Sequence, residues 1–99
     1  MSTLAIRKTK IVATIGPASD SVEILEQMIR AGMSVARLNL SHGSYQEHKM
    51  RISRIRQASE NLNIPVAIMI DTRGVEIRTG GIQQGFVELK SGASFSLYP

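Results

Sequence analysis

The chain has 99 residues, of which 42% are hydrophobic and 20% are charged, a balance typical of one small globular domain. It has no apolar run of 18 residues, no apolar signal region at its N-terminus and no cysteine. These features argue against a membrane span, secretion, a disulfide framework and thiolate chemistry, and they favour a cytoplasmic protein. The formal net charge of +4 favours anionic partners, phosphates or nucleic acid, without choosing between them.

The first two predicted elements are a strand and a helix. Residues 10–15 form an apolar, β-branched run that Gly16-Pro17 closes, which is typical of a buried strand followed by a turn. Asp20, followed three residues later by Glu23, resembles a capping box and predicts a helix start. Gly32 is placed to end this helix as a left-handed residue. The buried stripe of the helix is predicted to be Val22, Leu25, Met28 and Ile29.

The central stretch, residues 35–43, begins as an apolar strand, predicted for about residues 34–40, and ends in polar residues. Strand alternation places Arg37, Asn39 and Ser41 on one face, and Ala36, Leu38 and Leu40 on the other. If the leucine face packs on helices, Arg37 points into the interior, where an unpaired guanidinium is costly. Such a residue needs a partner, and a phosphate is a good one. The alternative is an edge strand whose polar face is simply solvated.

A second helix is predicted for residues 45–61, because Ser44 and Glu47 form a clear capping box. The next apolar run, residues 66–70, predicts a third strand that leads into Asp71-Thr72. The predicted buried stripe of the second helix is Tyr45, His48, Ile52, Ile55 and Leu62. A solvated basic face is predicted for Lys49, Arg51, Arg54 and Arg56, and a nucleic-acid role for it is disfavoured because no aromatic residues are interleaved for base stacking.

The order β-α-β-α-β indicates an α/β fold with parallel strands and crossover helices. The usual glycine-rich nucleotide fingerprints are absent from the sequence. A boundary is predicted at residues 74–79, after which short segments punctuated by Gly80-Gly81, Gly85 and Ser91-Gly92 indicate β-hairpins of a small antiparallel unit.

Ligands of parallel α/β folds bind at the carboxyl ends of the strands, and here those ends are polar. Asn39, Ser41, Asp71 and the carbonyl of Thr72 offer hard oxygen ligands with one formal negative charge. This set suits a monovalent cation, or a divalent one that shares phosphate oxygens. Two arginines, Arg37 and Arg78, supply donors for phosphate. The alternatives are that Asp71 only makes an Asx turn and that His42 is a loop residue that bonds backbone.

Three stretches, KTKIVATIGPAS (8–19), GMSVARLNLSHG (32–43) and DTRGVEIRTG (71–80), together resemble the N-terminal part of pyruvate kinase. The resemblance implies a (β/α)8 TIM barrel that is interrupted after its third strand by a β-rich lid domain. Residues 1–75 would then be the N-terminal part of the barrel domain, and residues 76–99 the first antiparallel strands of the lid.

The resemblance also implies the glycolytic reaction in which the phosphoryl group of phosphoenolpyruvate moves to ADP, giving pyruvate and ATP. This reaction requires K⁺ and Mg²⁺, and the family is typically a homotetramer. The implied roles are substrate phosphate binding by Arg37, K⁺ ligation by Asn39, Ser41, Asp71 and the Thr72 carbonyl, and contacts to the nucleotide and the transferred phosphate by Asn39, Leu40, Ser41, His42 and Arg78, with Pro17 near the adenine.

The chain departs from the family pattern at Arg73 and Val75, where the family commonly has Lys and Pro. Loss of that proline removes a rigid φ at the entry to the lid. A (β/α)8 barrel needs about 250 residues, and the family's transition-state lysine and Mg²⁺ ligands lie in later strands. The 99 residues alone are therefore expected to be inactive. Three strands of an open parallel sheet leave both edges uncovered, so aggregation or pairing with another copy is expected as well. The alternatives are a stand-alone phosphate-binding or regulatory module, or basic nucleic-acid binding.

Overall fold

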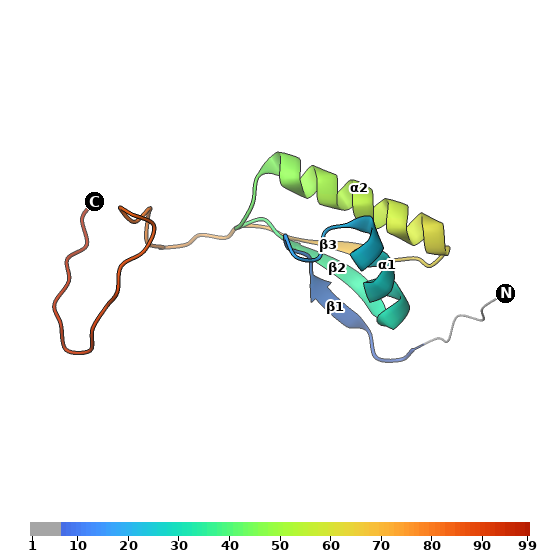
Figure 1. Cartoon of the computed structure of the whole chain (residues 1–99), viewed down its shortest axis with the longest axis horizontal. Helices are drawn as coiled ribbons and strands as arrows, with labels where there is room; N and C mark the ends of the chain where they lie inside the picture. The colour runs from blue at the N-terminus through green and yellow to red at the C-terminus, as the bar shows by residue number, and fades with distance from the viewer. Residues whose placement is uncertain (1–6) are drawn as a thin grey trace.

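The computed structural model describes residues 7–99, and its ordered part is a three-stranded parallel sheet with both helices on one face (Figure 1). The sheet order is β1-β2-β3, so each helix connects neighbouring strands. The predicted β-α-β-α-β order and its parallel pairing are confirmed. The elements are β1 (Ile11–Thr14), α1 (Val22–Ala31), β2 (Met33–Asn39), α2 (Tyr45–Leu62) and β3 (Ala67–Asp71).

Helix α1 begins one residue later than the sequence predicts. Its N-cap is Ser21, whose side chain accepts a hydrogen bond from the backbone N–H of Ile24. The prediction that Asp20 and Glu23 form the capping box is wrong, because Asp20 bonds to arginines of α2 instead. Gly32 ends the helix as predicted, with φ of 119°, a conformation that glycine adopts without steric cost.

Helix α2 has the predicted capping box, in which Ser44 and Glu47 each accept a bond from the backbone N–H of the other. It ends at Leu62, and Asn63 closes it in the left-handed conformation. His48 lies in the buried face as predicted. The prediction for Tyr45 is wrong, since 78% of this residue is exposed in the first turn of the helix.

The core lies between the helices and the covered face of the sheet. Its fully buried large side chains are Leu25 of α1, Leu38 of β2 and Ile55 of α2. On the opposite face of the sheet, Val12 and Met69 are about half exposed. The covered face therefore holds the fold together, while the open face, which carries Arg37, is available for other contacts. The complete core cluster is Ile15, Leu25, Ile29, Met33, Ala36, Leu38, Ile55, Ala58 and Val66.

Residues 72–99 leave the sheet and form turns, but no strand, within the described chain (Figure 1). Backbone bonds close turns at residues 82–85 and 90–93, near two of the predicted turn positions. The predicted hairpins do not form. Every residue of this segment is exposed, so its strand-forming residues have no core to pack against. The extended segment raises the radius of gyration to 18.5 Å, against about 13 Å for a compact chain of this length.

Residues 1–6 of the segment predicted to belong to the barrel lie outside the described residues. Neither helix formed by residues 7–99 combines the length and the hydropathy needed to cross a bilayer.

Candidate functional site

The carboxyl ends of the three strands meet at one edge of the sheet and form a polar rim, defined here as Thr14, Arg37, Asn39 and Asp71. The strand register explains this arrangement. Thr14 is paired with Arg37 between β1 and β2, and Asn39 is paired with Asp71 between β2 and β3. Because side chains alternate along each strand, all four residues belong to the open face. The rim is therefore built from residues far apart in the sequence.

Arg37 bridges the three strands. One guanidinium nitrogen, Nη1, donates to Thr14 Oγ1 at 2.9 Å, and Nη2 forms an ion pair with Asp71 Oδ2. The polar face is thus not simply solvated: its arginine is paired within the protein. The two side chains remain 29% and 46% exposed, so the pair is accessible to a ligand. At such exposure an ion pair contributes only about 0–1 kcal/mol to stability.

The loop after β2 is folded around Asn39. Its side-chain Oδ1 accepts the backbone N–H of Ser41 at 3.0 Å, and its carbonyl accepts the backbone N–H of His42 at 3.3 Å. The Asx turn considered for Asp71 is therefore found at Asn39. His42 is exposed, as a loop residue would be, and its carbonyl is contacted by His48.

The loop after β1 lies beside it. Ile15 N–H donates to the carbonyl of Arg37, which continues the pairing of β1 with β2 past the end of β1. Ser19 closes the next turn, because its Oγ accepts the N–H of Gly16 and its own N–H donates to the Gly16 carbonyl, each at 3.0 Å. Pro17 is held in this turn with its ring exposed. Both loops that carry predicted site residues therefore have defined conformations.

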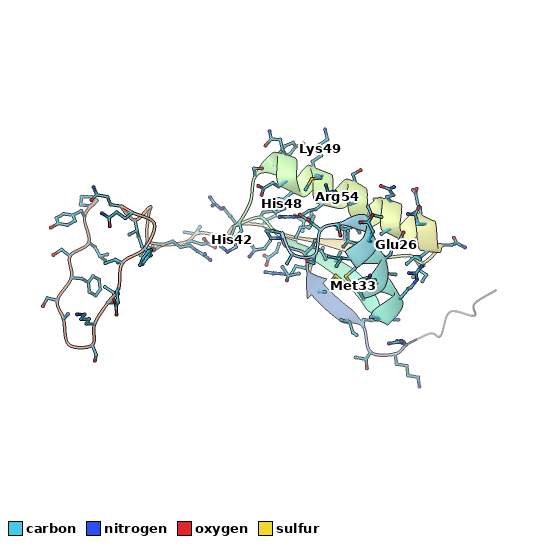
Figure 2. The ribbon with its side chains drawn as sticks, viewed as in Figure 1. Glu26, Met33, His42, His48, Lys49 and Arg54 are labelled. Atoms are coloured by element: carbon cyan, nitrogen blue, oxygen red, sulfur yellow. The ribbon has the colours of Figure 1, made fainter. Side chains whose placement is uncertain are left out.

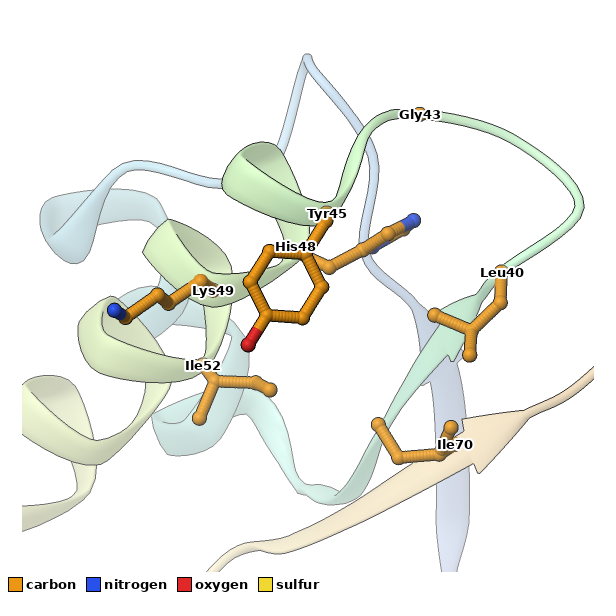
Figure 3. A pocket seen from close by; sticks show the side chains of 7 residues that line it. All are labelled: Leu40, Gly43, Tyr45, His48, Lys49, Ile52 and Ile70. Atoms are coloured by element: carbon orange, nitrogen blue, oxygen red, sulfur yellow. The ribbon is translucent and has the colours of Figure 1, made fainter.

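Leu40 belongs to the same predicted set, but its side chain lies on the other face of the sheet. It lines a pocket of about 460 Å³ between the end of the sheet and the start of α2 (Figure 3). Ile70 and Ile52 line the same pocket, and its edge includes Tyr45 and Lys49. Any contact of Leu40 with a ligand at the rim would therefore involve its backbone.

Two further predicted residues follow β3. Thr72 is exposed and directly follows Asp71, the rim residue of β3, in the chain. Arg78 lies in the segment that runs away from the sheet (Figure 1), and its guanidinium Nε pairs with Glu76 Oε2 at 2.7 Å. The structure therefore brings Arg37, Asn39 and Asp71 together, but it does not bring Arg78 to them.

Comparison with known proteins identifies the family of this chain. The model of the family described as "Pyruvate kinase, barrel domain" matches residues 6–98. The chain belongs to the pyruvate kinase family. Pyruvate kinase of Staphylococcus saprophyticus is 55% identical over 92 residues, which cover 93% of this chain and 16% of that protein. Pyruvate kinase of Staphylococcus aureus strain USA300 is 58% identical over 87 residues, 88% of this chain and 15% of that protein. The chain thus spans about one sixth of the length of these curated relatives.

The donor set of the rim fits a monovalent cation of the kind expected in the pyruvate kinase family. Asn39 and Asp71 are direct register partners, which in a sheet places their backbones about 4.8 Å apart. The ion pair with Arg37 uses one oxygen of Asp71, and a carboxylate has a second. The amide of Asn39 and the single carboxylate of Asp71 are hard ligands of low charge. A dedicated Mg²⁺ site does not fit the four rim residues, because they include a single carboxylate, that of Asp71, and Arg37 already offsets its charge.

The structure also shows contacts that the sequence patterns missed. Arg51, predicted to be on a solvated face of α2, has a side chain only 7% exposed and donates to Asp20 Oδ2 through Nε at 3.3 Å. Arg54 Nη1 donates to the Asp20 carbonyl at 3.1 Å. The prediction of a solvated face is wrong for Arg51, whereas the side chain of Arg54 is 38% exposed and Lys49 and Arg56 are exposed. Helical spacing carried a signal for this, since Arg51 follows His48 by three residues on the buried face.

Proposed function

We propose that this chain forms the opening strands of a pyruvate kinase barrel and that, in the complete enzyme, it supports phosphoryl transfer from phosphoenolpyruvate to ADP. The observation that carries the proposal is the rim, where Thr14, Arg37 and Asp71 converge from three strands at the edge at which parallel α/β folds bind ligands. Family membership supports the proposed reaction, and the rim supports the part that these residues are proposed to take in it.

Arg37 is the residue proposed to bind the substrate phosphate. A guanidinium has five N–H donors, and the bonds to Thr14 and Asp71 use two of its nitrogens. The remaining donors can bind phosphate oxygens while the strands hold the side chain in place. Phosphoryl transfer requires mainly positioning and positive charge around the moving group, which a fixed arginine supplies.

Asp71 places a negative charge beside Arg37, which by itself weakens the attraction of the rim for phosphate. A bound K⁺, held by Asn39, Ser41, Asp71 and the Thr72 carbonyl, supplies a positive charge that offsets this carboxylate. The proposed Mg²⁺ requirement is met by residues of the complete enzyme outside this chain. The nucleotide is proposed to contact the loop backbone from Asn39 to His42, the ring of Pro17 and, once the segment after β3 is folded over, Arg78.

The test is a chimeric enzyme in which these 99 residues replace the matching segment of Staphylococcus saprophyticus pyruvate kinase, referred to below as the chimera. We expect the chimera to form ATP from phosphoenolpyruvate and ADP, and the 99 residues alone to form none. A folded but inactive chimera would contradict the proposal. ATP formation by the pure 99-residue chain would contradict the need for the remaining segments.

The cation proposal has its own variant. Replacing Asp71 by Asn removes the formal charge but keeps the shape, so we expect the K⁺ concentration for half-maximal activity of the chimera to rise about tenfold, equivalent to ~1.4 kcal/mol. The control is Glu88→Gln, which removes an exposed carboxylate from the segment after β3. An unchanged K⁺ response in Asp71→Asn would exclude Asp71 as a ligand.

A second candidate function is a stand-alone phosphate-binding module. The specific observation in its favour is that these 99 residues assemble the rim by themselves. Calorimetry of the isolated chain with phosphoenolpyruvate and with ADP tests it. Heat of binding that fits a sub-millimolar dissociation constant would support a stand-alone module. Absence of binding heat would contradict it and favour a role within the complete barrel.

A further inference from the structure

Three side chains from α2 contact the two loops that flank the rim. His48 Nε2 lies 2.6 Å from the carbonyl oxygen of His42, in the loop after β2. Arg51 and Arg54 reach Asp20, at the end of the loop after β1. In Figure 2, His48 and Arg54 lie on the side of α2 that faces the sheet, whereas Lys49 points away from it. One helix therefore bonds to both loops.

The contact with the first loop is a largely buried ion pair. The side chains of Arg51 and Asp20 are 7% and 17% exposed. A buried charge is costly unless it is paired, so loss of Asp20 leaves Arg51 without its carboxylate, and loss of Arg51 leaves Asp20 with only the longer, 3.5 Å contact to Arg54. Asp20 directly follows Ser19, which closes the turn around Pro17. The ion pair therefore fixes the end of the loop that presents Pro17.

The contact with the second loop is a hydrogen bond of defined direction. A carbonyl oxygen only accepts hydrogen bonds, so His48 Nε2 carries the hydrogen and donates a hydrogen bond to the carbonyl oxygen of His42. His48 is 8% exposed, and its other ring nitrogen, Nδ1, is buried without a hydrogen-bond partner among residues 7–99. The polar function of this ring is therefore the bond to the loop.

The loop packs directly on α2 at Gly43. This residue has φ of 82°, and a Cβ added to it would lie 2.8 Å from Glu47 Oε2 and 3.2 Å from His48 Nε2. Such short approaches require glycine or a displacement of the neighbours. The path of the loop is thus set by the first turns of the helix, and not by the sheet alone.

We infer that Arg51 and His48 are positioning residues for the nucleotide, acting through the loops that hold Pro17 and His42. The inference rests on the proposed function, which places the nucleotide against these loops and the substrate phosphate against Arg37. Arg37 is held by sheet residues, independently of α2. Loosening the loops should therefore weaken the use of ADP and leave the use of phosphoenolpyruvate nearly unchanged.

The first experiment measures steady-state kinetics of the chimera carrying Arg51→Gln. We expect the KM for ADP to rise about tenfold, because a hydrogen bond to a charged group is lost, and the KM for phosphoenolpyruvate to stay within about twofold. The matched control is Arg56→Gln, an exposed arginine of the same helix, which should change neither value. A purely structural Arg51 would lower the melting temperature and leave both KM values unchanged, and that result would overturn the inference.

A double-mutant cycle tests whether Arg51 acts through Asp20. Asp20→Asn alone should raise the KM for ADP, and the double variant Asp20→Asn/Arg51→Gln should be no worse than the poorer single variant, because both changes break one interaction. Multiplication of the two single effects would show that Arg51 acts elsewhere and would overturn this step.

Two variants at His48 test the hydrogen bond to the second loop. His48→Gln keeps an N–H group near the position of Nε2 and should retain the KM for ADP, whereas His48→Leu removes the donor and should raise it several-fold. Equal effects of the two changes would overturn the role of the hydrogen bond. The unmodified chimera separates the two levels of inference: if it makes no ATP, the proposed function fails, and if it is active but its variants show no KM split, only the positioning role fails.

Discussion

The two faces of β2 differ in what their residues contact. On the covered face, Ala36 and Leu38 are completely buried and pack on the helices. On the open face, Arg37 bonds to Thr14 and Asp71 and remains partly exposed. A single strand thus alternates between residues that stabilise the fold and residues that can bind a ligand. The comparison predicts that changes on one face affect stability and changes on the other affect activity.

The largest effect is expected on the covered face, from Leu38→Ala. Removing a fully buried leucine side chain costs about 2–5 kcal/mol, which lowers the melting temperature of a barrel-sized domain by on the order of 10 °C. Leu62→Ala, at a half-buried position, should lower it less. Calorimetric melting of the chimera measures both changes. KM values that stay constant well below the melting temperature would support the separation of the two faces, and a selective loss of substrate binding in Leu38→Ala would break it.

The next effect is expected on the open face, from Arg37→Met. Methionine keeps much of the length of the side chain but cannot donate to phosphate, so we expect kcat/KM for phosphoenolpyruvate to fall about 100-fold. Stability should change little, since the ion pair with Asp71 is partly exposed. Arg37→Lys keeps the charge without the planar fork and should give an intermediate value. Full activity in Arg37→Met, measured in the chimera, would remove Arg37 from the proposed site.

Local sequence patterns predicted the elements well, because their signals are local. The Ser44–Glu47 capping box and Gly32 marked helix ends that the structure confirms. The rim was also predictable in outline: once the strands are parallel, their carboxyl ends meet at one edge. This topological rule brought Arg37 and Asp71 together without any information on their contact.

Other features depend on long-range contacts that spacing does not encode. Aspartate is a residue type that often caps helices, so the sequence favours that role for Asp20. Only the position of α2 shows that Asp20 pairs instead with Arg51, 31 residues later. The exposure of Tyr45 has a related cause, because helical periodicity gives the buried face and not the turn at which burial begins. The predicted hairpins of residues 76–99 fail for a third reason: strand-forming residues need a partner strand and a core, and this segment has neither here.

The smallest effect is expected at Thr14, which contacts Arg37 from the neighbouring strand. Thr14→Val keeps the shape and the strand preference but removes the acceptor of the 2.9 Å bond from Arg37 Nη1. A net hydrogen bond is worth about 0.5–1.5 kcal/mol, so we expect the KM of the chimera for phosphoenolpyruvate to rise by about two- to tenfold, with the melting temperature nearly unchanged. Thr14→Ser retains the hydroxyl and is the matched control. Because the two variants differ mainly in that acceptor, equal KM values would show that Asp71 alone suffices to orient Arg37, and the open face would then depend on one contact where the structure shows two.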